Sequence, residues 1–163
     1  MHVDLLARRL IHAPPAAVFA RATDSARFAE LFAGCGPVPG ITHIVADGPP
    51  AIGSRRELQQ RDGSRLQECI TAFDPPHHHA YTLQRLRPPM RWLALDALAD
   101  WTFLPEAGGT DLRWHYRWQL TSVIAWPLAW PLLHGFMLTA MHRCLAALAA
   151  SVEADASPAA EPG

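Results

Sequence analysis

The sequence contains no lysine and no asparagine, and all 14 of its basic residues are arginine. These two absences are typical of a GC-rich genome and say little about function. The arginines are scattered over the predicted strands and turns, and the formal net charge is only -1. A nucleic-acid-binding protein normally needs a concentrated basic face. We therefore expect no nucleic-acid partner.

Cysteine is also scarce. Cys35, Cys69 and Cys144 are odd in number and widely spaced, and no Cys-x-x-Cys pair is present to form a metal knuckle or a redox pair. Reduced thiols in a cytoplasm fit this pattern best. Charged residues interrupt the first ten positions, so a signal peptide is not expected. The sequence thus predicts a cytoplasmic protein.

Long apolar runs are missing too. The longest uninterrupted one, Val123 to Leu133, carries two prolines and is shorter than the roughly 18 residues that a membrane span needs. On this length argument we expect no spanning helix. Hydrophobic residues nevertheless make up 50% of the 163 positions and charged residues 18%, which is enough to bury one large core. A single domain is the expectation.

The first forty residues predict a strand followed by two short helices. Residues 2–12 are typical of a strand, which Pro14-Pro15 ends, and proline is well placed to open a helix over residues 16–22. Asp24 or Ser25 can cap a second helix that reaches about Phe32. Glycines and prolines between positions 34 and 40 then close this helical pair.

From Ile41 the pattern changes to strand-length segments separated by turn signals. These signals are Asp47-Gly48-Pro49-Pro50, Asp62-Gly63, Asp74-Pro75-Pro76, Arg87-Pro88-Pro89 and Gly108-Gly109. The last segment, 112–120, alternates strictly between apolar or aromatic and polar residues. The sequence therefore predicts an antiparallel meander.

After Thr121 the apolar spacing becomes helical, from about Trp130 to Val152. At 100° per residue one face of this helix holds Trp130, His134, Met137, Leu138, Met141, Leu145, Leu148 and Val152. Residues 154–163 have nothing to bury and are expected to form a disordered tail. The predicted domain covers residues 1–153, with an α+β fold in which a curved antiparallel sheet of about seven strands wraps on the long C-terminal helix.

This order of elements resembles the helix-grip fold of the START-like (SRPBCC) superfamily, particularly its polyketide cyclase/dehydrase and lipid-transport branch. The resemblance covers nearly the whole chain and rests on turns, edges and core positions. It is carried by residues 11–19, 52–58, Asp62-Gly63 leading to Glu68, Phe73-Asp74-Pro75-Pro76 leading to Tyr81, Gly109-Thr110 and 145–148. None of these stretches is a catalytic signature. The resemblance implies a cavity between sheet and helix that holds a small hydrophobic molecule, such as a lipid, a quinone or an aromatic polyketide.

Aromatic side chains of the last strand are the first candidates for this cavity. Trp114, Tyr116 and Trp118 share one face of the strand. Large rings on a curved strand border empty space where the helix does not reach them. Plain core packing explains the same residues equally well, and the sequence leaves both interpretations open.

Arg56 and Glu68 flank the Asp62-Gly63 turn, and their facing depends on its register. A three-residue loop, Asp62 to Ser64, with glycine in the left-handed position places Arg56 on the face of Glu68, together with Leu58, Leu66 and Ile70. A two-residue loop moves Arg56 to the face of Cys69 instead. We prefer the first because it gathers the apolar residues. On the inner face this pair could orient a ligand carbonyl or hydroxyl, whereas on the outer face it is a solvated cross-strand pair.

The remaining candidates lie on the long helix and on the strand after Pro76. His134 stands on the apolar helix face as a donor or proton carrier, although a core histidine bonded to a carbonyl fits as well. Met137 and Met141 share that face and belong to the expected lining. Tyr81 has the inward phase of Leu83 and could present a hydroxyl.

Two other features of the sequence carry weaker alternatives. His77-His78-His79 invites a metal, but successive strand residues point to opposite faces, so only two could share an ion. We expect no metal and no cofactor. The segment with Trp126 and Trp130 is apolar enough to touch a bilayer surface or close the cavity mouth, or simply to dock on the sheet edge.

Three functions follow from these observations. The first is binding of a small hydrophobic or aromatic ligand for carriage or sensing. The second is an enzyme of the polyketide cyclase or dehydratase type, in which His134, Tyr81 or Glu68 supplies acid/base help. The third is an interaction module that uses the surface around Trp126 to hold a partner protein or a membrane.

Overall fold

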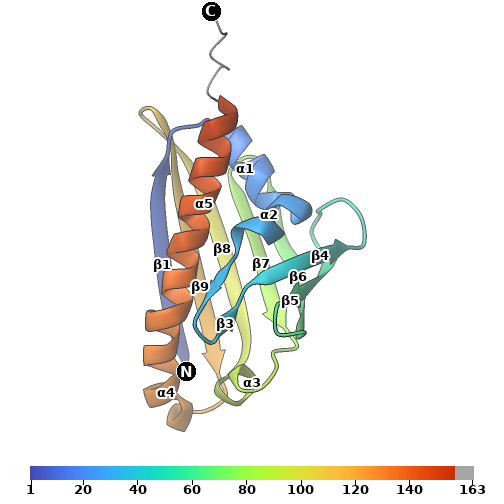
Figure 1. Ribbon diagram of the computed structural model, residues 1–163, viewed down its shortest axis with the longest axis vertical. Coiled ribbons are helices and arrows are strands. Elements are labelled where there is room, and N and C mark those ends of the chain that lie inside the picture. Colours follow the sequence, from blue (N-terminus) through green and yellow to red (C-terminus); the bar gives the residue numbers. More distant parts are fainter. Residues whose placement is uncertain (157–163) are drawn as a thin grey trace, which may run out of the picture.

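The computed structural model describes residues 1–156, and its main feature is a seven-stranded antiparallel sheet (Figure 1). Across the sheet the strands follow the order β1 (His2–Ile11), β9 (Gly109–Leu120), β8 (Ala94–Glu106), β7 (His78–Gln84), β6 (Arg65–Asp74), β5 (Arg55–Gln60) and β4 (Ile41–Ala46). Apart from the β1–β9 pairing, sequence neighbours pair throughout, so the predicted meander is confirmed. β2 (Gly34–Cys35) and β3 (Val38–Pro39) form a separate small hairpin.

Two short helices follow the first strand, as predicted. α1 spans Pro15–Thr23 with a proline at its first position, where the missing amide hydrogen costs nothing. α2 spans Ser25–Leu31, and the carboxylate of Asp24 accepts hydrogen bonds from the amides of Ala26 and Arg27. A further short helix, α3 (Met90–Leu93), lies between β7 and β8 and was not predicted.

The C-terminal helix is longer than predicted. A 3-10 turn (Val123–Ala125), α4 (Trp126–Leu132), the π-helical turn η2 (Leu133–Met137) and α5 (Leu138–Ala156) follow one another without a break. Residues 154–156 were expected in a tail, but they belong to this helix. The helix continues for four residues after Val152, its last buried residue. The rest of the predicted tail, 157–163, lies outside the described residues.

This continuous helix also corrects the expectation drawn from apolar run length. Val123–Ala156 is 34 residues long, and its most apolar 18-residue window has a mean hydropathy of 1.4. By length and composition it could cross a membrane. In the fold described here, Met141, Cys144, Leu145 and Leu148 of α5 are fully buried in the core that the helix shares with the sheet.

The layers follow from this arrangement. Figure 1 shows α5 lying lengthwise over one face of the sheet, with α1 and α2 beside it. The α+β helix-grip fold with its seven strands is thereby confirmed. α3, α4 and the β2–β3 hairpin lie toward the end of the molecule opposite the C-terminal end of α5 (Figure 1).

Candidate functional site

A cavity of about 110 Å³ lies between the inner face of the sheet and the helices. This volume exceeds the roughly 10–15 Å³ that one water needs, so there is space for several water-sized groups. The cavity is bordered mostly by apolar side chains. Its lining comprises Phe28, Phe32, Pro37, Val38, Pro39, Ile41, Leu58, Gln60, Asp62, Ser64, Leu66, Glu68, Tyr81, Leu83, Leu86, Arg87, Pro88, Pro89, Met90, Trp114, Tyr116, Trp118, Leu132 and Met137.

The exposure of these residues shows where the cavity opens. Pro37, Asp62, Arg87 and the prolines that follow it are exposed, and they come from the β2–β3 hairpin, the β5–β6 turn and the segment before α3. The lining residues of β7 and β9 are buried. The cavity therefore opens at the end of the molecule that carries α3 and α4, and its floor lies against the sheet.

Arg56 and Glu68 form a buried ion pair beside this floor. They are direct cross-strand partners on β5 and β6, and Arg56 Nη2 lies 2.6 Å from Glu68 Oε2. Arg56 is 6% exposed and Glu68 2% exposed. The preferred inward facing is thus observed. The turn is centred one residue earlier than expected, because the amide of Gln60 bonds to the carbonyl of Ser64 and Gly63 takes the left-handed position with φ of 80°.

Burial dominates the electrostatics of this pair. Removal from water raises the pKa of Glu68, and the positive charge of Arg56 opposes that effect. His79 lies next to them, with its Nε2 3.5 Å from Arg56 Nη2. Burial, followed by the charge of Arg56, lowers the pKa of His79 to about 3. Of the three groups, Glu68 is the one that lines the cavity.

Two buried tyrosines accompany Glu68. The guanidinium carbon of Arg56 lies 5.6 Å from the centre of the Tyr81 ring, within range of a cation–π contact. Burial and then the negative charge of Glu68 raise the pKa of both Tyr81 and Tyr116 well above the ordinary value. Their hydroxyls therefore remain protonated and can act as hydrogen-bond donors at neutral pH.

The tryptophans of the last strand take part in both the core and the cavity. Trp114 stacks on Trp101 with 4.2 Å between ring centres, and Trp118 packs on Tyr116 at 5.0 Å. Trp114, Tyr116 and Trp118 nevertheless line the cavity as well. The indole nitrogens of Trp114 and Trp118 are buried without a hydrogen-bond partner among residues 1–156. Buried donors of this kind are uncommon in folded proteins.

Six of the nine residues predicted for the site line the cavity: Glu68, Tyr81, Trp114, Tyr116, Trp118 and Met137. Arg56 is not part of the lining, but it forms an ion pair with Glu68, which is. Met141 is fully buried one turn beyond Met137 and is not part of the lining. Whether any of these residues contacts a ligand stays a prediction.

His134 is placed differently from its prediction. Its Nδ1 donates to the carbonyl oxygen of Trp130 at 3.1 Å, and its ring stacks on that of Trp130 at 4.2 Å, outside the cavity lining. The cause is the π-helical turn η2, which adds a residue to one turn of the helix. A projection at a constant 100° per residue therefore assigns Trp130 and His134 to the wrong side relative to Met137.

Several lining residues were missed. Leu86 and Met90 were not considered, Pro88 was expected only as part of a turn, and Phe28 and Phe32 only as residues of the second helix. His79 does not line the cavity but lies beside Arg56, and it was considered solely in the metal alternative, although its position two residues before Tyr81 gave it the same inward phase. Period-two spacing could have found it.

The histidine cluster does not converge on one point. His77 is exposed in a turn, His78 Nε2 lies 2.9 Å from Asp100 Oδ2, and His79 points into the core. Within residues 1–156, no group of three or more histidine, cysteine, aspartate or glutamate side chains could hold a metal ion.

A family model described as polyketide cyclase / dehydrase and lipid transport matches residues 2–153. The chain belongs to this family. As a member of it, the protein is of the hydrophobic-ligand-binding or polyketide-cyclase type. No functionally curated protein matches the sequence at a significant level.

Solved structures similar to this family member share its fold at low identity. TTHA0849 from Thermus thermophilus is 19% identical with a TM-score of 0.70, over 95% of this chain and 100% of that chain. The di-domain ARO/CYC BexL from the BE-7585A biosynthetic pathway is 17% identical with a TM-score of 0.73, over 93% of this chain and 50% of that chain. Ara h 8.0201 is 13% identical with a TM-score of 0.63, over 94% and 99%.

Proposed function

We propose that the protein binds a small, mainly apolar molecule with a few oxygen atoms, such as a quinone, a lipid or a polyketide-like aromatic, for carriage or sensing in the cytoplasm. The observation that carries this proposal is an apolar cavity with a buried carboxyl and two tyrosines at its floor. Burial of apolar surface supplies the affinity, and a few polar groups supply the orientation.

The polar groups define the ligand chemistry. Tyr81 and Tyr116 can donate to a carbonyl oxygen, and Glu68 can accept from a hydroxyl or, when protonated, donate to a carbonyl. A pure hydrocarbon would make no hydrogen bond with any of these groups, so it would gain nothing from them.

The test is native mass spectrometry of the protein purified from the organism that encodes it. Leu83→Trp fills the cavity from β7, and Leu98→Trp makes the same change at an exposed position on the outer face of the sheet. We expect a small-molecule adduct on the wild type and on the Leu98→Trp control, and no adduct on Leu83→Trp. Equal adducts on all three proteins would place the ligand elsewhere.

A second candidate is a polyketide cyclase or dehydratase, favoured by the raised pKa of Glu68 at the cavity floor. The fold shared with a di-domain ARO/CYC supports it. Glu68→Gln would then reduce turnover of a polyketide chain by about a hundredfold or more while ligand binding persists. In a carrier, the same variant changes affinity only, and no product forms with either protein.

A further inference from the structure

The end of the molecule near the cavity opening carries a large exposed apolar surface. Ile124 is 90% exposed, Trp92 70% and Leu128 62%. We call this surface the apolar end and define it as Trp92, Leu95, Val123, Ile124, Trp126, Leu128 and Trp130, all of which are exposed. Several large apolar side chains exposed at one end of a folded domain often mark an interaction site.

The residues of the apolar end belong to neighbouring elements. α3 and α4 contact each other, and the hydroxyl of Thr121 bonds to the carbonyl of Trp92. Leu95 follows Ala94, which pairs with Leu120, three residues before Val123 opens the 3-10 turn. Figure 1 shows α3 and α4 together at one extremity of the molecule, so the surface forms a projecting tip.

The same elements form the rim of the cavity. Met90 of α3 and Leu132 of α4 line it, and Pro88 and Pro89 are exposed at its opening. Whatever covers the apolar end therefore lies against the entrance through which a ligand would pass.

Three arginines lie at this end of the molecule. Residues 85–95 and 121–137 contain three arginines, Arg85, Arg87 and Arg91, and no aspartate or glutamate. All three are exposed, and none forms an ion pair with a carboxylate within residues 1–156. Acids lie beside these arginines as well. The pKa of Asp62 is lowered mainly by its hydrogen bonds with Ser64 and slightly by Arg87, Asp96 is exposed next to Leu95, and Asp47 and Glu57 border a surface pocket together with Arg85 and Arg87.

From this geometry we propose that the apolar end docks on the surface of an anionic lipid bilayer, with the cavity opening turned toward the lipid. Tryptophan favours the membrane–water interface, and leucine and isoleucine at the tip enter the acyl boundary. The arginines then face the phosphate layer, where each contributes to binding through the negative surface potential. That a ligand is exchanged with the bilayer rests on the proposed function, whereas the docking itself does not.

The experiment is co-sedimentation of the full chain with two kinds of vesicle, phosphatidylcholine alone and phosphatidylcholine with about a third phosphatidylglycerol. We expect binding to the anionic vesicles, weaker binding to the neutral ones, and weakening at high salt. The double variant Ile124→Ser/Leu128→Ser should reduce the partition coefficient by about tenfold or more. Ile52→Ser is the matched apolar control, because Ile52 is also 70% exposed but lies in the β4–β5 loop.

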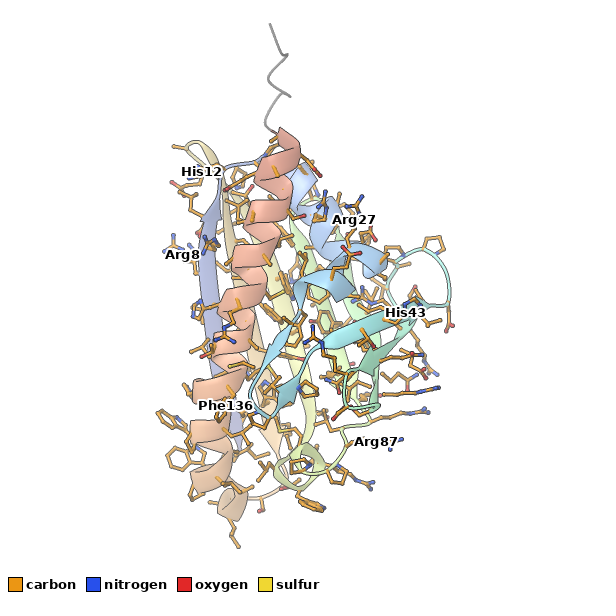
Figure 2. All side chains as sticks on the ribbon, in the orientation of Figure 1. Arg8, His12, Arg27, His43, Arg87 and Phe136 are labelled. Carbon is orange, nitrogen blue, oxygen red and sulfur yellow. The ribbon has the colours of Figure 1, made fainter. Side chains whose placement is uncertain are left out.

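The arginine contribution is tested separately. Arg87→Gln and Arg91→Gln should each lower binding to anionic vesicles about fivefold, with little effect on neutral ones. Arg27→Gln is the control, since Arg27 is exposed on α2, away from Arg87 and the α3–α4 end (Figure 2). Melting temperatures of all variants, each at an exposed position, should match that of the wild type.

Three outcomes would overturn the proposal. The first is no binding of the wild type to anionic vesicles, and the second is an equal loss of vesicle binding in Ile52→Ser and in Ile124→Ser/Leu128→Ser. The third is a wild-type dimer in sedimentation equilibrium that Ile124→Ser/Leu128→Ser dissociates and Ile52→Ser does not. The last outcome would assign the surface to a second copy of the chain. Because the vesicles contain no cavity ligand, Leu83→Trp should bind them as the wild type does. Failure of the cavity proposal is therefore distinguishable from failure of docking.

Discussion

Arg56 and Glu68 face each other across β5 and β6, with 2.6 Å between Nη2 and Oε2 and almost no solvent around either side chain. Two opposite charges buried in this way depend on each other, because each has lost its hydration. Arg56 also lies next to His79, whose lowered pKa keeps it neutral, and over the ring of Tyr81. The electrostatics of the cavity floor therefore depend on both charges being present.

Removing one partner of the pair should be costly. Glu68→Ala leaves Arg56 charged and buried without its counterion, and we expect a loss of about 3–5 kcal/mol in the free energy of unfolding. The double variant Arg56→Met/Glu68→Leu removes both charges and should be much closer to the wild type. Urea unfolding measures both. A loss below about 1 kcal/mol in Glu68→Ala would show that water reaches Arg56.

His79 should make the stability depend on pH in mildly acidic solution. Its native pKa of about 3 is far below the ordinary histidine value of 6.5, so between these two values the unfolded chain binds the extra proton. The contribution of His79 to the free energy of unfolding is therefore fully present above pH 6.5. Below pH 6.5 it falls by about 1.4 kcal/mol for each pH unit. Urea midpoints at pH 6.5 and 5 measure this decline.

His79→Gln is the control for the pH experiment, because glutamine does not titrate. Carboxylates and the other histidines are the same in both proteins, so the difference between the two pH profiles reports on His79. The variant should show a flatter profile between pH 6.5 and 5. Parallel profiles would mean that His79 is protonated as readily in the native state as in the unfolded chain.

Cys144 should be unreactive in the native protein. Its side chain is fully buried on α5, and burial raises the pKa of its thiol to about 12. Cys35 and Cys69 are only half-buried. Iodoacetamide followed by peptide mass spectrometry should find label on Cys35 and Cys69, and label on Cys144 only after denaturation. Rapid native labelling of Cys144 would show that α5 separates readily from the sheet.

The packing of α5 on the sheet should depend on individual leucines. Leu145 is fully buried, and Leu145→Ala should destabilise the fold by about 2–5 kcal/mol through lost burial and the space left behind. Leu6→Ala is the control, since Leu6 is 56% exposed on β1. Its effect should stay within about 0.5 kcal/mol in the same urea titration.

The sequence predicted strands and helices correctly where interactions between residues close in the chain determine them. Alternation along 112–120 depends on neighbours two residues apart, and the Asp24 cap depends on amides two and three residues away, so both were visible in the chain. The facing of Arg56 and Glu68 also followed from gathering apolar residues on one side of a hairpin. α3 was missed because its four residues are too few for a helical period.

The sequence by itself determined the architecture, because period two, period 3.6 and the Gly–Pro turns are properties of neighbouring residues. Only the tertiary structure decided what surrounds the cavity and what stays in solvent. The π-helical turn at Leu133–Met137 moved His134 away from the cavity, and the assembly of α3 with α4 left Trp92, Ile124 and Leu128 uncovered. These outcomes depend on contacts between segments far apart in the chain, which no local spacing records.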